Sequence, residues 1–170
     1  MTTKKDFVAL LMGSDSDLPM LQGARDVLTQ LGIPFELKIT SAHRTPEATR
    51  RYVQEADERG CAVFIAAAGL AAHLAGAVAA LTCKPVIGIP IETGPLNGID
   101  ALLSTVQMPG GIPVATVAIG KAGAKNAAYL AAQILALSDP ELSDRLWAAR
   151  RANAEDIQEK DARLRQGKGS

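Results

Sequence analysis

The chain has 170 residues, of which 48% are hydrophobic, and its 18 Lys and Arg residues balance its 18 Asp and Glu residues. Balanced charge gives no overall field that attracts nucleic acid or an anionic membrane, so neither is expected as a partner. The chain is long enough to bury a core without disulfides or metal ions, and its two cysteines form no CxxC motif. We therefore expect a single domain, residues 1–170, located in a reducing cytoplasm.

Short apolar runs alternate with stretches of helical spacing along the whole chain. Strands are predicted at residues 7–12, 35–39 (as a buried strand), 62–67, 85–91 and 114–119. Helices are predicted at residues 19–31, 47–59, a short stretch ending near 81, 99–106, 120–137 and about 140–164. No apolar run is long enough to span a membrane.

This alternation predicts an α/β fold. Five strand–helix units with short connections imply right-handed crossovers and a three-layer α/β/α sandwich, with a flavodoxin-like parallel sheet of five strands. The core is expected over about residues 7–137. The extra C-terminal helix, about residues 140–164, is expected to pack on a neighbouring subunit, and residues 165–170 to form a disordered tail.

The motif Ser41-Ala-His-Arg-Thr-Pro46 follows the second predicted strand. Ligands of open α/β sheets bind beyond the carboxyl ends of the strands. Arg44 offers a planar fork suited to phosphate or carboxylate, and His43 can exchange a proton near neutral pH. The only other histidine, His73, follows the third predicted strand. Two histidines on adjacent strand ends favour proton-transfer chemistry, although a packed, structural role for His73 stays open.

The loop Gly13-Ser-Asp-Ser-Asp17 follows the first predicted strand. Backbone N–H groups and serine hydroxyls at a helix N-terminus can hold a phosphate, and an aspartate beside them suits ribose hydroxyls. An ordinary capping turn explains the same residues equally well, and Asp15 with Asp17 also leaves Mg²⁺ open. The chain lacks a dinucleotide fingerprint, a P-loop, a serine-hydrolase elbow and a zinc-ligand cluster, so we assign no metal.

Four motifs occur together and in a specific order: Met12-Gly-Ser-Asp-Ser-Asp17, Ser41-Ala-His-Arg-Thr-Pro46, Ala71-Ala-His-Leu74 and Gln107-Met-Pro-Gly-Gly-Ile-Pro113. With them, nearly the whole chain resembles the N5-carboxyaminoimidazole ribonucleotide mutase family of purine biosynthesis, also called the phosphoribosylaminoimidazole carboxylase catalytic subunit family. The resemblance implies a cofactor-free isomerase that converts N5-carboxyaminoimidazole ribonucleotide to 4-carboxy-5-aminoimidazole ribonucleotide. It also implies a homo-octamer of flavodoxin-like subunits.

The resemblance further implies a role for each residue in these motifs. His43 would be the general acid and base, and His73 would contact the aminoimidazole and its carboxylate. The implied substrate-binding residues are Ser14, Ser41 and Arg44 at the 5′-phosphate, Asp17 at the ribose, and also Ser16, Ala42, Gly69, Ala72 and Leu74. The turn formed by Met108, Pro109, Gly110 and Gly111 would help to close the pocket, within one subunit or across a subunit boundary.

Two residues depart from the family's usual Gly-Gly-Ala-Ala-His-Leu-Pro-Gly pattern. Leu70 replaces a glycine, which restricts φ and adds bulk, and Ala75 replaces a proline, which is expected to loosen the turn before the helix. Two other functions stay open: a direct carboxylase (a lyase) that takes the free ribonucleotide and CO₂, and a non-catalytic module that binds FMN or a nucleotide. The related carboxylase typically lacks the Ala-Ala-His-Leu pattern, so His73 favours the mutase.

Overall fold

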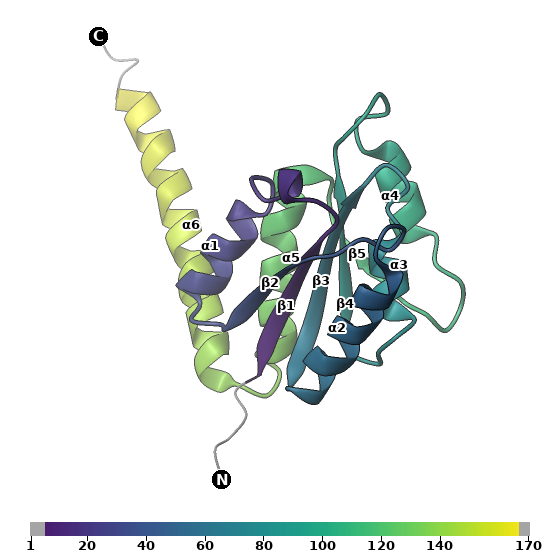
Figure 1. Ribbon diagram of the computed structural model, residues 1–170. Coiled ribbons are helices and arrows are strands. Elements are labelled where there is room, and N and C mark those ends of the chain that lie inside the picture. Colours follow the sequence, from purple (N-terminus) through teal and green to yellow (C-terminus); the bar gives the residue numbers. More distant parts are fainter. Residues whose placement is uncertain (1–5, 167–170) are drawn as a thin grey trace. The chain divides into compact units, whose positions relative to one another are not determined.

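A computed structural model describes residues 6–166. Within them, five parallel strands form one sheet in the order β2-β1-β3-β4-β5 (Figure 1). The strands are β1 (Phe7–Met12), β2 (Phe35–Ile39), β3 (Cys61–Gly69), β4 (Val86–Ile91) and β5 (Ala115–Thr116). This strand order is that of flavodoxin-like doubly wound sheets, and it confirms the predicted fold class.

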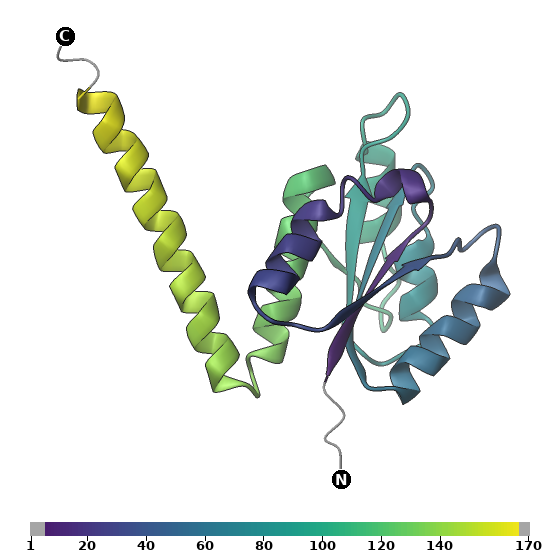
Figure 2. The same ribbon diagram turned by 60° about the vertical axis from the view of Figure 1, so that its left-hand side comes forward.

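Helices cover both faces of the sheet. Along the described chain the α-helices are α1 (Gln22–Gln30), α2 (Pro46–Glu58), α3 (Leu74–Ala79), α4 (Ile99–Val106), α5 (Gly120–Leu135) and α6 (Pro140–Gln166). Of these, α1 to α4 and the first part of α5 belong to the compact unit that contains the sheet. Figures 1 and 2 show α1 and the first part of α5 on one face, and α2, α3 and α4 on the other. The layers of the predicted sandwich are therefore present in the part of the chain that precedes residue 132.

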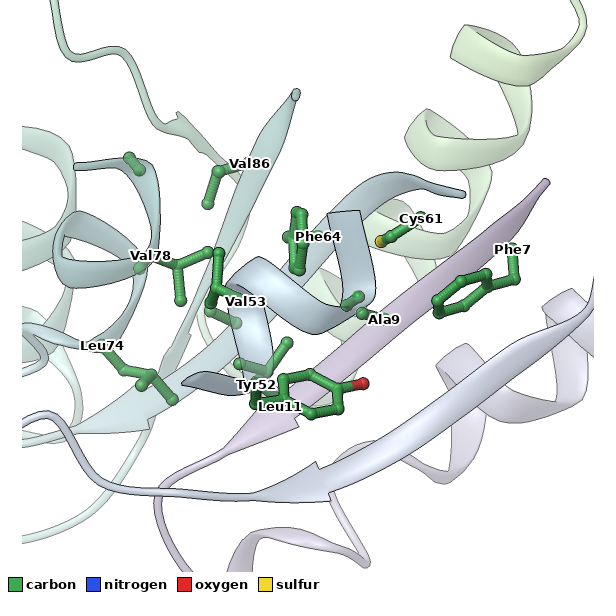
Figure 3. Packing of buried hydrophobic residues seen from close by; sticks show 14 residues of the cluster. Phe7, Ala9, Leu11, Tyr52, Val53, Cys61, Phe64, Leu74, Val78 and Val86 are labelled. Atoms are coloured by element: carbon green, nitrogen blue, oxygen red, sulfur yellow. The ribbon is translucent and has the colours of Figure 1, made fainter. Parts of the chain in front are cut away.

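The core on the α2 and α3 side is built from alternate residues of β1. Phe7, Ala9 and Leu11 point to this side, where they pack with residues such as Val53 of α2 and Phe64 of β3 (Figure 3). The remaining residues of β1 face the other layer, because side chains alternate along a strand. All six residues of β1 are buried, as expected for a parallel strand covered on both faces.

Strand β2 differs from the prediction of a buried strand. It lies at the edge of the sheet, where Leu37 is 40% and Ile39 is 57% exposed. The apolar residues Leu37 and Ile39 are its exposed ones, whereas the charged Glu36 and Lys38 are partly buried. Glu36 accepts hydrogen bonds from Tyr52 and from Arg59, so polar contacts join this edge to α2 and its C-terminal end.

Two predicted boundaries are also wrong. The first helix was expected from residue 19, but a 3-10 helix (Asp15–Asp17) and a run of turns come first, and α1 begins at Gln22. Pro19 lacks an N–H group and cannot add a hydrogen bond there. The fifth strand was expected over residues 114–119, but β5 has two residues, after which only the Val117 N–H still donates to Gly88.

The chain divides into two compact units, and residues 132–166 belong to the second, which contains the end of α5 and helix α6. Asp139 caps α6 by accepting the Leu142 N–H at 3.0 Å, and Pro140 occupies the first helical position. Within this unit, a groove of about 230 Å³ lies beside Trp147. The Arg150 guanidinium makes a cation–π contact with the Trp147 ring, 5.6 Å from the ring centroid.

Helix α6 continues to Gln166, so residues 165 and 166 of the predicted tail are helical. Residues 167–170 lie outside the described part of the chain. Packing of α6 on a neighbouring subunit stays a prediction. Between residues 6 and 166, no helix is both long and apolar enough to cross a bilayer.

Candidate active site

Loops that follow four strands meet around a cavity of about 440 Å³ at the carboxyl edge of the sheet. The chain adds β2 on one side of β1 and β3 on the other, so this edge includes a topological switch point, where open α/β sheets bind ligands. The cavity is lined by Gly13, Ser14, Ser16, Asp17, Ser41, Ala42, His43, Arg44, Ala68, Gly69, Leu70, Ala71, His73, Leu74 and Thr93.

The loop that carries His43 is held by threonine hydroxyls. The Thr45 hydroxyl accepts the Ser41 N–H at 2.9 Å, and the Arg44 N–H donates to Ser41 Oγ at 3.2 Å. Below the loop, the buried hydroxyls of Thr40 and Thr49 lie 2.7 Å apart. These contacts leave the His43 ring and the Arg44 guanidinium exposed on a loop whose backbone is fixed.

The two histidines of the chain meet in this cavity. His43 Nε2 lies 2.8 Å from His73 Nδ1, and the rings stand edge to face with their centroids 4.9 Å apart. The sequence predicts that the two histidines follow adjacent strands. This is wrong, because β2 and β3 lie on either side of β1. One of the two bonded nitrogens donates and the other accepts, so a proton lies between the rings. This arrangement suits a group that both gives and takes a proton.

Polar groups of the first loop face the same cavity. Arg44 Nη2 donates to the Gly13 carbonyl at 2.9 Å, which links the His43 loop to the loop after β1. Ser14 Oγ accepts the Ser16 N–H at 3.3 Å and lies 2.9 Å from Ser16 Oγ. Hydroxyl, amide and guanidinium donors therefore gather at one end of the cavity, as an anionic group requires.

Asp17 lines this end of the cavity and is only 7% exposed. Burial raises the pKa of its carboxyl group, and the nearby charge of Asp15 adds to the rise. Backbone hydrogen bonds from Ser14 and Gly13 offset part of this effect. A buried carboxylate that costs stability is typical of a residue retained for binding or catalysis.

The loop before His73 has a left-handed backbone conformation at residue 70, where the family pattern has a glycine and this chain has a leucine. Leu70 has a φ of 53°, in the left-handed region, and its side chain lies against the backbone of Gly94. Leu70 thus adopts the conformation that its side chain disfavours. Ala75 was predicted to lie in the turn before the helix. It is instead a buried residue of α3 itself.

Most of the predicted site residues line the cavity, but two groups do not. Ala72 is buried behind it and donates its N–H to Ser104, and Met108, Pro109, Gly110 and Gly111 are not among the lining residues of this chain. Thr93 lines the cavity and was missed. It follows β4, so the rule that ligands bind beyond strand ends also applies to it. Between residues 6 and 166, no group of three or more His, Cys, Asp or Glu side chains could hold a metal ion.

Comparison with known proteins decides the family. The family model described as AIR carboxylase matches residues 7–156. The chain belongs to the AIR carboxylase family.

Solved and curated relatives agree over nearly the full length. The chain is 51% identical over 164 residues to the N5-carboxyaminoimidazole ribonucleotide mutase of Pyrococcus horikoshii, covering 96% of this chain and 92% of that protein. It is 50% identical over 152 residues to the Escherichia coli protein of the same name, covering 89% and 90%. The crystal structure of Treponema denticola PurE matches with a TM-score of 0.83 and 33% identity, covering 94% of this chain and 98% of that one.

In this member of the AIR carboxylase family, Leu70→Gly is expected to stabilise the fold. Glycine adopts a positive φ without steric cost, so the free energy of unfolding should rise by about 1 kcal/mol. Chemical denaturation measures the change. Leu70→Ala is the matched control, because it removes the same side chain but keeps a Cβ in the left-handed region. An equal gain in both variants would trace the effect to the side chain and not to φ.

Asp17→Asn is expected to raise the free energy of unfolding at pH 7. Because the pKa of Asp17 is higher in the folded protein than the ordinary 3.8, ionisation costs stability above the raised pKa. This cost vanishes as the pH falls below the ordinary value, so the gain should disappear near roughly pH 3. Denaturation at both pH values tests this, with Asp144→Asn on an exposed carboxylate of α6 as control. A gain that persists at low pH would contradict burial of the charge as its cause.

Proposed function

We propose that this protein is an N5-carboxyaminoimidazole ribonucleotide mutase of purine biosynthesis, an isomerase. The observation that carries the proposal is the 2.8 Å contact between His43 Nε2 and His73 Nδ1 in a cavity that also presents anion-binding donors. The curated relatives at about half identity carry this name. A site for this reaction has to protonate a substrate nitrogen, retain CO₂ between two steps and bind a phosphate group.

The reaction needs one proton to be given and one to be removed. In the proposed mechanism, His43 protonates the exocyclic nitrogen that carries the carboxylate, the C–N bond breaks, and CO₂ leaves with the amine neutral. The ring carbon next to the amine-bearing carbon then attacks CO₂ and forms the new C–C bond. Loss of the proton from that carbon restores the aromatic ring, and His43 accepts it. His73 is hydrogen-bonded to His43, holds the His43 imidazole in position and faces the carboxylate of the substrate.

The other end of the cavity is proposed to hold the ribose phosphate. The hydroxyls of Ser14 and Ser41 and the guanidinium of Arg44 are the donors for the 5′-phosphate, and Asp17 accepts from the ribose hydroxyls. Arg44 donates a hydrogen bond to the Gly13 carbonyl through Nη2, and the guanidinium has further N–H groups for the phosphate. The remaining polar and small residues shape the floor beneath the base.

We further infer assembly into a homo-octamer and a cytoplasmic location, and we assign no cofactor. Support for self-association comes from α4, where Ile99, Leu103 and Val106 recur at helical spacing and are each about half exposed. Both histidines are exposed in the single chain, whereas recapture of CO₂ requires that water be kept out. A neighbouring subunit that covers the cavity would meet this requirement. The inference of a cytoplasmic location rests on the two cysteines, which form no CxxC motif and are expected to stay thiols.

An assay with two alternative substrates, in the absence of ATP, tests the proposed activity. Purified protein is given either N5-carboxyaminoimidazole ribonucleotide or the free aminoimidazole ribonucleotide with bicarbonate. We expect efficient conversion of the first substrate only. Preference for the second would make the protein a direct carboxylase, and no product from either would overturn the assignment of an enzyme.

His43→Asn is expected to abolish turnover while largely preserving nucleotide binding. Asparagine can still hydrogen-bond to His73 but cannot give and take a proton, so kcat should fall by about 100-fold or more. Calorimetric titration with the aminoimidazole ribonucleotide measures binding in the same variant. Normal turnover would remove His43 from the acid and base role, and loss of binding would make it a substrate contact instead.

A further inference from the structure

The loop that carries His73, residues 70–73, is tied to α4 by a side-chain hydroxyl that the proposed mechanism does not use. The Ala72 N–H donates to Ser104 Oγ at 3.1 Å. Ser104 Oγ also lies 2.7 Å from the Asp100 carbonyl oxygen, one turn earlier in the helix. The carbonyl oxygens of Leu70 and Ala101 also lie 3.3 Å from Ser104 Oγ, so the Asp100 carbonyl is the nearest of three acceptors for its one proton. The same hydroxyl accepts from the Ala72 N–H through a lone pair. A continuous chain of hydrogen bonds therefore joins the loop to the helix backbone.

Helix α4 is a firm anchor for this contact. Its inner residues Ala101 and Thr105 are 0% and 2% exposed. Thr105 packs so closely on β4 that a Cβ built at Gly88 would lie 2.4 Å from Thr105 Cγ2. Ser104 therefore presents its hydroxyl from an element that is packed directly against the sheet.

The loop needs such a contact because its backbone is tightly bent. Leu70 is left-handed, and the His73 N–H donates to the Ala71 carbonyl at 2.8 Å, two residues back. Ala72 lies between them and is 1% exposed, and the Ser104 hydroxyl is the hydrogen-bond partner of its N–H, so removal of that hydroxyl takes away the hydrogen bond of a buried amide. Thr105 contributes little here, since its hydroxyl lies 3.4 Å from the Ala72 carbonyl and 2.7 Å from that of Ala101.

We propose that Ser104 is a positioning residue, whose hydroxyl holds the Ala72 N–H and so keeps His73 Nδ1 within hydrogen-bond distance of His43 Nε2. Ser104 does not line the cavity and acts through the backbone of the loop. Its effect on turnover rests on the proposed function. Its effect on the histidine pair does not, because that contact exists without substrate.

The test uses Ser104→Ala in full-length protein, with ¹⁵N-labelled histidine. The chain has only two histidines, so long-range ¹H–¹⁵N spectra show which of the four ring nitrogens carry a proton. In the wild-type protein we expect one of the two bonded nitrogens to be protonated and its partner not. In Ser104→Ala both rings should show the averaged tautomers of free, exposed imidazole. Turnover should fall about tenfold or more through kcat, with KM nearly unchanged.

Ser138→Ala is the matched control, because the Ser138 hydroxyl also donates to a backbone carbonyl, that of Leu135 at 3.3 Å, and Ser138 is not among the residues that line the cavity. It should leave the ring-nitrogen signals and kcat as in the wild-type protein. Unchanged ring signals in Ser104→Ala would overturn the proposal, even if turnover fell. So would equal changes in the Ser138→Ala control.

Amide exchange in the wild-type protein provides a test that does not depend on folding of the variant. The Ala72 amide should exchange at least tenfold more slowly than that of its exposed neighbour Ala71, although both lie in a loop. Equal exchange of the two amides would overturn the hydrogen bond to Ser104. If the wild-type protein converted neither substrate, the proposed function would fail while the ring-nitrogen and exchange measurements still decided the role of Ser104.

Discussion

Pairing of β1 with both of its neighbours, β2 and β3, determines where the functional loops lie. The registers align Met12 with Ile39 on one side and with Ala67 on the other, so these strands end at the same edge of the sheet. Strand β1 is buried along its whole length, and sliding it by one residue would exchange its two packed faces. The core that holds β1 in register therefore also sets the separation of the two histidines, although their strands do not touch.

The side chains that hold the site loops in place are mainly hydroxyls, not ion pairs. Thr40, Thr45 and Thr49 fix the loop of His43, and Ser104 is proposed to fix that of His73. A hydroxyl can bond a backbone amide and carbonyl at once and carries no charge into the core, so it avoids the desolvation cost of a buried ion pair. The ion pairs that the structure describes, such as those of Arg59 and Arg163, lie elsewhere and are exposed, where they contribute little.

Much of the fold and of the candidate site could be predicted from the sequence, because both depend on local patterns. The bounds of β1 and α4 were predicted correctly, since apolar spacing and flanking glycines mark them. The edge position of β2 was missed, although its alternating charges carried the signal. The sequence could not reveal Ser104, because the contact with Ala72 joins residues 32 apart and depends on how closely α4 packs on Gly88. The unusual φ of Leu70 is likewise a property of the folded loop.

Strain and rigidity in the His73 loop have a common explanation in the chemistry proposed for the site. A reaction that releases CO₂ and captures it again succeeds only if recapture is faster than escape, so the acid and base must stay aligned between the two steps. A loop that moved freely would lose this alignment. Leu70 in a left-handed conformation and a buried Ala72 N–H each cost stability unless the rest of the structure compensates. The hydrogen bond from Ala72 to Ser104 provides that compensation at the backbone, and it leaves the His73 ring free to face the substrate.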